Sequence, residues 1–196
     1  MKILIFAGST RAQSFNRQLA KVAAGIATQA GAEVTLLELA SLDIPLYNAD
    51  LEARGTPTDV IRLKQLMFEH PGWVICSPEY NGSYTALLKN TIDWASSPVK
   101  GDATWSQGTK PFAGKVVGLL AASPGALGGL RSLTHLSPLL SNLKCWVAPE
   151  QFALAQASGA FDADGQLQSE KQMEGVRAVV TQVLWAAQRF NDKNAV

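Results

Sequence analysis

The sequence predicts an α/β fold: a doubly wound, five-stranded parallel sheet with helices on both faces. Two observations lead to this fold class. Short apolar runs alternate along the chain with longer segments whose apolar residues recur every three to four positions. The first of these runs, residues 2–7, is continuous and rich in β-branched residues, which is typical of a strand buried on both faces. Such strands, joined by helices, form a parallel sheet covered on each side.

The five expected strands are short and rich in apolar and β-branched residues. They cover residues 2–7, 33–39, 73–77, 115–123 and 145–149. The five expected helices begin near Phe15, Val60, Leu87, Leu130 and Met173, where apolar residues start to mark one helical face. The connections 41–57 and 98–114 contain Pro or Gly and no such spacing. Five alternating strands and helices favour a flavodoxin-like arrangement.

Composition places the chain among globular proteins. Its 196 residues are 47% hydrophobic and 17% charged, which suits one globular domain spanning residues 1–196 with a sizeable core. The net charge of +1, without charged blocks, argues against binding to nucleic acid or to a membrane surface. No apolar run has the length of a signal-peptide core or a membrane span, so we expect a cytoplasmic protein. Cys76 and Cys145 lie in apolar contexts and are expected to be buried free thiols.

A loop with the sequence GSTRAQSFN follows the first strand and leads into the first helix. In a doubly wound sheet, ligands bind at the carboxyl ends of the strands. The N–H groups at a helix start attract an anion, Ser9, Thr10 and Ser14 add hydroxyl groups, and Arg11 adds a charge that suits a phosphate. The loop therefore predicts a cradle for one phosphate group.

Two common phosphate loops are excluded, because the chain has neither G-x-x-x-x-G-K-[ST] nor G-x-G-x-x-G at this place. A single phosphate monoester fits the loop better than a pyrophosphate. The alternative interpretation is that Ser14 only caps the helix and Arg11 is a solvated surface charge. The loop alone does not favour phosphate binding over simple capping.

A second segment favours the phosphate. The motifs GSTRAQSFNRQLA, PEYNGS with LLKNTIDW, and SPGALGG follow one another along the chain. Together they resemble the NADPH-dependent FMN reductase family, flavodoxin-like flavoenzymes that include quinone, azo-dye and chromate reductases. The resemblance covers nearly the whole chain. It implies FMN as cofactor, NADPH or NADH as electron donor, and a quinone, azo dye, metal oxyanion or free flavin as small-molecule acceptor.

The resemblance also implies which residues hold the cofactor. The positions that match the family are Ser9, Arg11, Ser14, Phe15 and Asn16 for the phosphate, Pro78, Glu79, Tyr80 and Asn81 for the ring, and Ser123 after the fourth strand. After Pro78 turns the chain, backbone N–H groups of Glu79, Tyr80 and Asn81 are expected at the ring edge. The Glu79 carboxylate suits an electron-rich ring badly, so we expect its main chain to bind. The glycines of residues 125–129 are also explained by a tight turn alone.

Two segments differ from the family pattern. Tyr84, Thr85 and Ala86 stand where relatives often have a Pro-Gly pair, and the connection 97–111, with Trp105, is longer than usual. Relatives are commonly dimers or tetramers, which implies a homodimer or homotetramer here. Candidate interface positions are Tyr84, Trp105, Arg131 and Glu150, the first two in loops expected near the site.

Hydride transfer through a flavin needs no protein acid or base, so we assign no catalytic residue and no metal ligand. His70 and His135 occur in no nucleophile or metal pattern. Two alternatives stay open: a flavodoxin-type electron carrier, and an FMN-binding domain without turnover. The near-neutral charge argues against the carrier, which needs an acidic docking face. The physiological acceptor and the preference between NADPH and NADH are not determined by the sequence.

Overall fold

Five parallel strands form one sheet in the computed structural model, which describes residues 1–191. The strands are β1 (Lys2–Ala7), β2 (Glu33–Leu37), β3 (Gly72–Cys76), β4 (Val116–Ala122) and β5 (Trp146–Leu154). They pair in the order β2-β1-β3-β4-β5, and each pair is parallel. This order is that of the flavodoxin-like doubly wound sheets, so the predicted fold class is confirmed.

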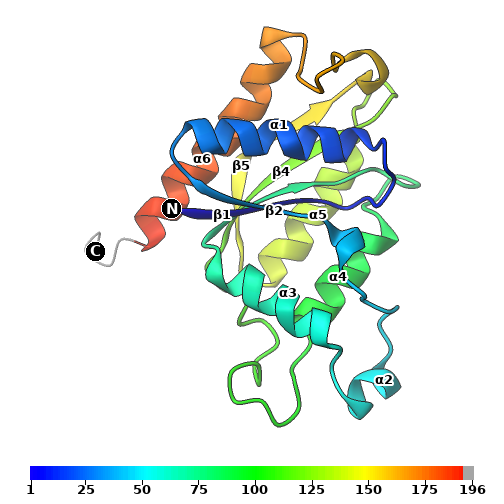
Figure 1. Cartoon of the computed structure of the whole chain (residues 1–196), viewed down its shortest axis with the longest axis vertical. Helices are drawn as coiled ribbons and strands as arrows, with labels where there is room; N and C mark the ends of the chain where they lie inside the picture. Colours follow the sequence, from blue (N-terminus) through cyan, green and yellow to red (C-terminus); the bar gives the residue numbers. More distant parts are fainter. Residues whose placement is uncertain (192–196) are drawn as a thin grey trace.

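Helices cover both faces of the sheet (Figure 1). One face packs against α1 (Phe15–Gln29) and α6 (Glu170–Asn191), and the other against α3 (Thr58–Glu69), α4 (Ala86–Ser96) and α5 (Leu130–Asn142). In β1, Ile3 and Ile5 point to the first layer, whereas Leu4 and Phe6 point to the second. The unbroken apolar run of β1 follows from this double coverage.

Helix α6 lies close to the middle of the sheet because β4 has a glycine there. A Cβ at Gly118 would lie 2.6 Å from Cγ2 of Val183 and 2.8 Å from Cγ1 of Val179. Neither valine has room to move, since both are buried in the core. The glycine therefore sets the distance between α6 and the sheet.

Two elements differ from the prediction. The segment 41–57 contains a short helix, α2 (Ala49–Arg54), which Asn48 caps by accepting the N–H groups of Asp50 and Leu51. Strand β5 continues to Leu154 instead of ending at residue 149. Its register shifts by a bulge around Pro149, after which pairing with β4 resumes. A proline interrupts the strand signal but is tolerated at an edge-strand bulge.

The connection 97–111 lies far from the carboxyl ends of the strands. Trp105 is 3% exposed and meets the Phe68 ring edge-on, with 5.7 Å between ring centroids. Phe68 lies near the end of α3, just before β3 begins, and is therefore near the amino-terminal ends of the strands. The expectations that this connection lies near the site and that Trp105 is an interface residue are therefore wrong.

Cys76 and Cys145 are buried free thiols, as predicted. Burial raises the pKa of the Cys145 thiol to about 12, although the nearby Lys115 opposes the shift. Within residues 1–191, no helix combines the length and the apolar character that a membrane crossing requires.

Candidate cofactor-binding site

A cleft opens at the carboxyl ends of β1, β3 and β4. It lies where the chain order reverses, since β2 and β3 pair with opposite edges of β1. Its lining consists of Ser9, Arg11, Ser14, Phe15, Asn16, Pro78, Glu79, Tyr80, Ala122, Ser123 and Pro124. The structure thus brings together nine of the ten predicted residues and leaves Asn81 outside the lining. Sequence reasoning missed Ala122 and Pro124, although both flank Ser123.

The first loop is anchored where it leaves β1. The N–H of Gly8 donates to the carbonyl of Cys76 at 2.9 Å, and the hydroxyl of Thr85 donates to the carbonyl of Gly8 at 2.8 Å. A Cβ at Gly8 would lie 3.1 Å from Oγ1 of Thr85 and 3.2 Å from Cβ of Leu88. The glycine lets the start of α4 approach, and this contact fixes the root of the loop.

Ser14 is the N-cap of α1. Its backbone is extended, with φ −72° and ψ 128°, and its hydroxyl oxygen accepts the N–H of Arg17 at 3.4 Å. The N–H groups of Phe15 and Asn16 begin the helix and have no carbonyl one turn earlier. The Ser14 hydroxyl proton is still free to donate. Capping and anion binding are therefore compatible at this residue.

Arg11 provides an exposed positive charge beside the helix start. Its guanidinium lies 5.5 Å from the centre of the Phe15 ring, and it forms no ion pair within residues 1–191. Ser9 is nearly buried, and its hydroxyl oxygen accepts the N–H of Arg11 at 3.4 Å. The hydroxyl of Ser9, the start of α1 and the unpaired guanidinium of Arg11 thus lie together at one end of the cleft.

Arg17 holds this loop from outside the cleft, a role that the sequence did not indicate. Its Nη1 atom donates to the carbonyls of Arg11 at 3.2 Å and Ala12 at 3.4 Å. Its other terminal nitrogen forms an ion pair with Glu38. The two arginines therefore differ, because Arg11 is free for a ligand whereas Arg17 is used to position the loop.

The Asn16 side chain is used within the protein, so a contact of this residue with a phosphate is left to its backbone. Its Nδ2 donates to the carbonyl of Ala122 at 2.8 Å, and its Oδ1 accepts the N–H of Ala122 at 3.0 Å. The amide is 3% exposed and ties α1 to the end of β4. Only the backbone N–H of Asn16 is left to face an anion.

Residues 80–83 form a tight turn at the other end of the cleft. Tyr80 and Ser83 exchange backbone hydrogen bonds at 2.9 and 3.1 Å, and the turn residues Asn81 and Gly82 have φ of 51° and 80°. The N–H of Tyr80 is therefore used inside the turn, contrary to our expectation that it points to a ligand. The N–H groups of Glu79 and Asn81 have no partner within residues 1–191.

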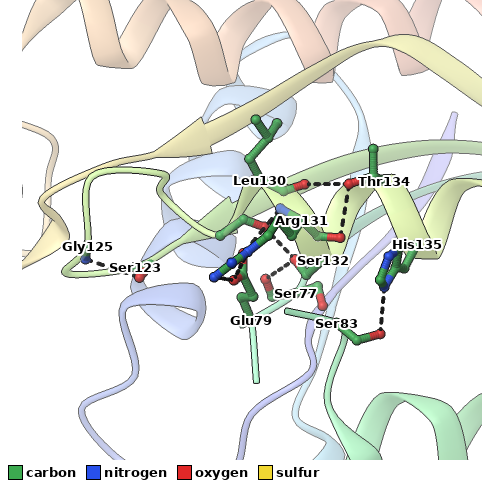
Figure 2. Close-up of polar contacts among 11 residues, drawn as sticks. Ser77, Glu79, Ser83, Ser123, Gly125, Leu130, Arg131, Ser132, Thr134 and His135 are labelled. Carbon is green, nitrogen blue, oxygen red and sulfur yellow. Dashed lines mark hydrogen bonds and ion pairs between the residues drawn. The ribbon is translucent and has the colours of Figure 1, made fainter. Parts of the chain in front are cut away.

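The carboxylate of Glu79 points to α5 (Figure 2). Its two oxygens accept hydrogen bonds from Nε and from the backbone N–H of Arg131, at 2.6 and 3.1 Å, and the guanidinium completes the ion pair. Because Arg131 is in the first turn of α5, the carboxylate also neutralises that helix start. Its negative charge is thus compensated by Arg131.

Ser123 can reach a ligand only through its hydroxyl group. Its backbone N–H donates to Leu154 and its carbonyl accepts from Ala157, at 3.1 and 3.0 Å. The hydroxyl oxygen accepts the N–H of Gly125 at 3.2 Å, which leaves the hydroxyl proton free to donate to a ligand (Figure 2).

The glycine-rich loop packs closely on the end of β5. A Cβ at Gly128 would lie 2.7 Å from the backbone of Leu154, so this glycine is needed for the close packing.

The cleft is chemically asymmetric, and this asymmetry fits FMN. One end gathers hydrogen-bond donors and an unpaired arginine, which suit a phosphate dianion. The other end presents the free N–H group of Glu79 and the exposed ring of Tyr80, and the free N–H group of Asn81 lies in the adjoining turn. The only carboxylate on the lining is neutralised by Arg131. An electron-rich ring is therefore not placed beside an uncompensated negative charge.

Comparisons with known proteins place the chain in a family. The sequence profile of the NADPH-dependent FMN reductase family matches residues 1–159. An NAD(P)H-dependent FMN reductase from Pseudomonas aeruginosa is 33% identical over 189 residues, with 96% of this chain and 94% of the relative covered. An NADPH:quinone oxidoreductase from Arabidopsis thaliana is 32% identical over 196 residues, with 97% and 91% covered.

One solved structure extends the likeness to three dimensions. The flavoenzyme FerB from Paracoccus denitrificans, an NAD(P)H:(acceptor) oxidoreductase, superimposes with a TM-score of 0.82 at 29% identity. The match covers 96% of this chain and 98% of that one.

Proposed function

The chain belongs to the NADPH-dependent FMN reductase family, and we propose that its cleft binds FMN with the phosphate at the start of α1 and the ring beside residues 78–81. As a member of this family, the protein is an NAD(P)H-dependent oxidoreductase that uses FMN. The observation that carries the assignment of residues is the asymmetry of the cleft. Arg11 is unpaired at one end, whereas Glu79 is neutralised at the other.

The chain's own residues have binding and orienting roles. The hydroxyls of Ser9 and Ser14, the N–H groups that begin α1 and the guanidinium of Arg11 hold the phosphate. The N–H group of Glu79 on the lining, with that of Asn81 from the adjoining turn, orients the polar edge of the ring, and the Ser123 hydroxyl donates from the lining. Bound FMN supplies the redox chemistry by accepting a hydride from the nicotinamide and passing two electrons to the acceptor.

We infer that the acceptor is a quinone. The relatives named as quinone reductases or quinone oxidoreductases support this choice, for example the protein from Arabidopsis thaliana. Near the ring segment, the exposed side chains of Tyr80, Leu127 and Leu130 offer apolar surface suited to a flat, neutral molecule. A steady-state screen of quinone, azo-dye and free-flavin acceptors with either nicotinamide tests the choice, and a higher kcat/KM for a non-quinone acceptor would overturn it.

We also infer a homodimer or homotetramer in the cytoplasm. The same exposed apolar residues, Tyr80, Leu127 and Leu130, support a second subunit near the mouth of the cleft. Multi-angle light scattering of the FMN-loaded protein measures the assembly. A fully active monomer at all concentrations would contradict this inference.

The assignment of Arg11 is tested with FMN and riboflavin, which differ by the phosphate alone. Replacing Arg11 by alanine removes charge-assisted hydrogen bonds worth about 1.5–3 kcal/mol, so the Kd of FMN rises by roughly 10- to 150-fold. The Kd of riboflavin stays the same. Lys21→Ala is the matched control, because Lys21 is an exposed cation on α1, the helix that follows the Arg11 loop, and lies outside the cleft. An equal loss for both flavins, or no loss for FMN, would refute the assignment.

A further inference from the structure

A second hollow, of about 530 Å³, adjoins the cleft. It lies between the loop that follows β5 and the first turn of α6, and its lining consists of Pro124, Gln156, Ser158, Gly159, Ala160, Gln168, Ser169 and Gln172. Pro124 also lines the cleft, so the two concavities share a wall. The two concavities are therefore adjacent at this proline.

The loop that forms the hollow is fixed to the cleft. The N–H of Gln156 donates to the carbonyl of Gly125 at 3.2 Å, and the N–H of Ala157 donates to the carbonyl of Ser123 at 3.0 Å. Gln156 has a φ of 52°, which is uncommon for a residue other than glycine. The hollow therefore keeps a defined position relative to Ser123.

The lining is polar but uncharged. It contains three carboxamides and two hydroxyls, with no acidic or basic side chain. Within residues 1–191, the side chains of Gln156, Ser158 and Gln172 form no hydrogen bond. Gln168 uses its Nε2 to donate to the carbonyl of Phe161 at 3.0 Å, which leaves its Oε1 as an acceptor. The hollow thus offers neutral donors and acceptors together.

The neutral donors and acceptors of the hollow fit some of the enzyme's ligands better than others. A quinone has too little hydrogen-bonding capacity to use three carboxamides and two hydroxyls. An adenosine matches them, because carboxamides pair with the amino group and ring nitrogen of adenine, and hydroxyls pair with ribose. A hollow of this size also lies within the usual range for small-ligand sites.

We propose that the hollow binds the adenosine part of the nicotinamide donor while the nicotinamide lies against the flavin. This proposal rests on the FMN position given above. Binding of a ribose 2′-phosphate normally uses a nearby arginine, and the lining has no cation. The site therefore discriminates little between NADH and NADPH, and the two Kd values agree within about fivefold.

The first experiment removes hydrogen bonds from the lining of the FMN-loaded enzyme. Gln172→Leu and Ser158→Ala each raise the Kd of NAD⁺ and NADP⁺, measured by calorimetry, by about 2- to 12-fold, the range for one neutral hydrogen bond. The KM values of NADH and NADPH rise in parallel. FMN content and kcat stay the same. Gln188→Leu is the control, since Gln188 is exposed on α6 about four turns further along.

The second experiment adds a charge. In Gln172→Lys the new cation attracts the ribose 2′-phosphate of NADP⁺. This variant therefore lowers the Kd of NADP⁺ relative to that of NAD⁺ by about two- to fivefold, the range for an exposed ion pair, whereas Gln188→Lys leaves the ratio of the two Kd values unchanged. Normal nucleotide binding in Gln172→Leu and Ser158→Ala would overturn the proposal, as would a loss of FMN from these variants. The FMN assignment is tested separately: if it is wrong, the Arg11→Ala variant binds FMN with normal affinity.

Discussion

Replacing Arg17 by lysine is expected to weaken FMN binding without changing the charge of the protein. Arg17 contacts three groups at once, namely the carbonyls of Arg11 and Ala12 and the carboxylate of Glu38. A lysine ammonium is a compact donor that does not span three such partners. The loop that carries Arg11 then loses part of its support, although no residue on the cleft lining has changed.

The magnitude follows from the contacts. A hydrogen bond from a charged group contributes about 1.5–3 kcal/mol in general, and the ion pair at a partly exposed site contributes at most about 1 kcal/mol. The two bonds to the loop are long, at 3.2 and 3.4 Å, so we take about 1–2 kcal/mol for ordering the loop. This corresponds to a rise in the Kd of FMN of roughly 5- to 30-fold.

The assay is fluorescence titration of the apoprotein with FMN and with riboflavin. Arg17→Lys raises the Kd of FMN more than that of riboflavin, because the loop contacts the phosphate. Glu38→Gln keeps the bonds to the loop and has a smaller effect, which makes it the matched control. If Arg17→Lys binds FMN normally, or loses both flavins equally, then Arg17 does not position the phosphate loop.

Three further predictions concern the fold and the turn. Gly118→Ala places a methyl group against Val183 and Val179 and lowers the free energy of unfolding by about 1–3 kcal/mol in urea denaturation; an unchanged midpoint would contradict the close packing. Asn81→Gly keeps the positive φ and normal FMN affinity, whereas Asn81→Ala weakens FMN binding by about 1 kcal/mol, and equal affinities would refute a role for the turn conformation. Burial lowers the pKa of Lys64 from 10.5 to about 8, so between pH 8 and 10.5 the unfolded chain binds more protons than the folded chain. As the pH rises through this range, the free energy of unfolding of the wild type increases relative to that of Lys64→Met, and parallel pH profiles of the two proteins would argue against this shift.

The sheet and its helices were predictable because burial on both faces leaves a direct signal. The continuous apolar runs of β1 and β4 and the helical spacing after Phe15 each correspond to elements found in the structure. The end of β5 was not predictable, since Pro149 interrupts the run and pairing resumes only through a bulge. The position of Trp105 was also missed, because its partner Phe68 is distant in the sequence and only the tertiary fold brings the rings together.

The residues of the cleft were predictable as a group, but their individual roles were not. Asn16 and Glu79 have side chains that bind ligands in many proteins, yet here both bind the protein itself. The reason is geometric: the phosphate that we propose at the start of α1 would be held by backbone N–H groups, and the direction of these groups depends on contacts that fix the main chain. Asn16 fixes α1 to β4, and Glu79 fixes the ring segment to α5. These two polar side chains therefore orient the main chain, and Arg11 is the cation on the lining that we propose for the phosphate.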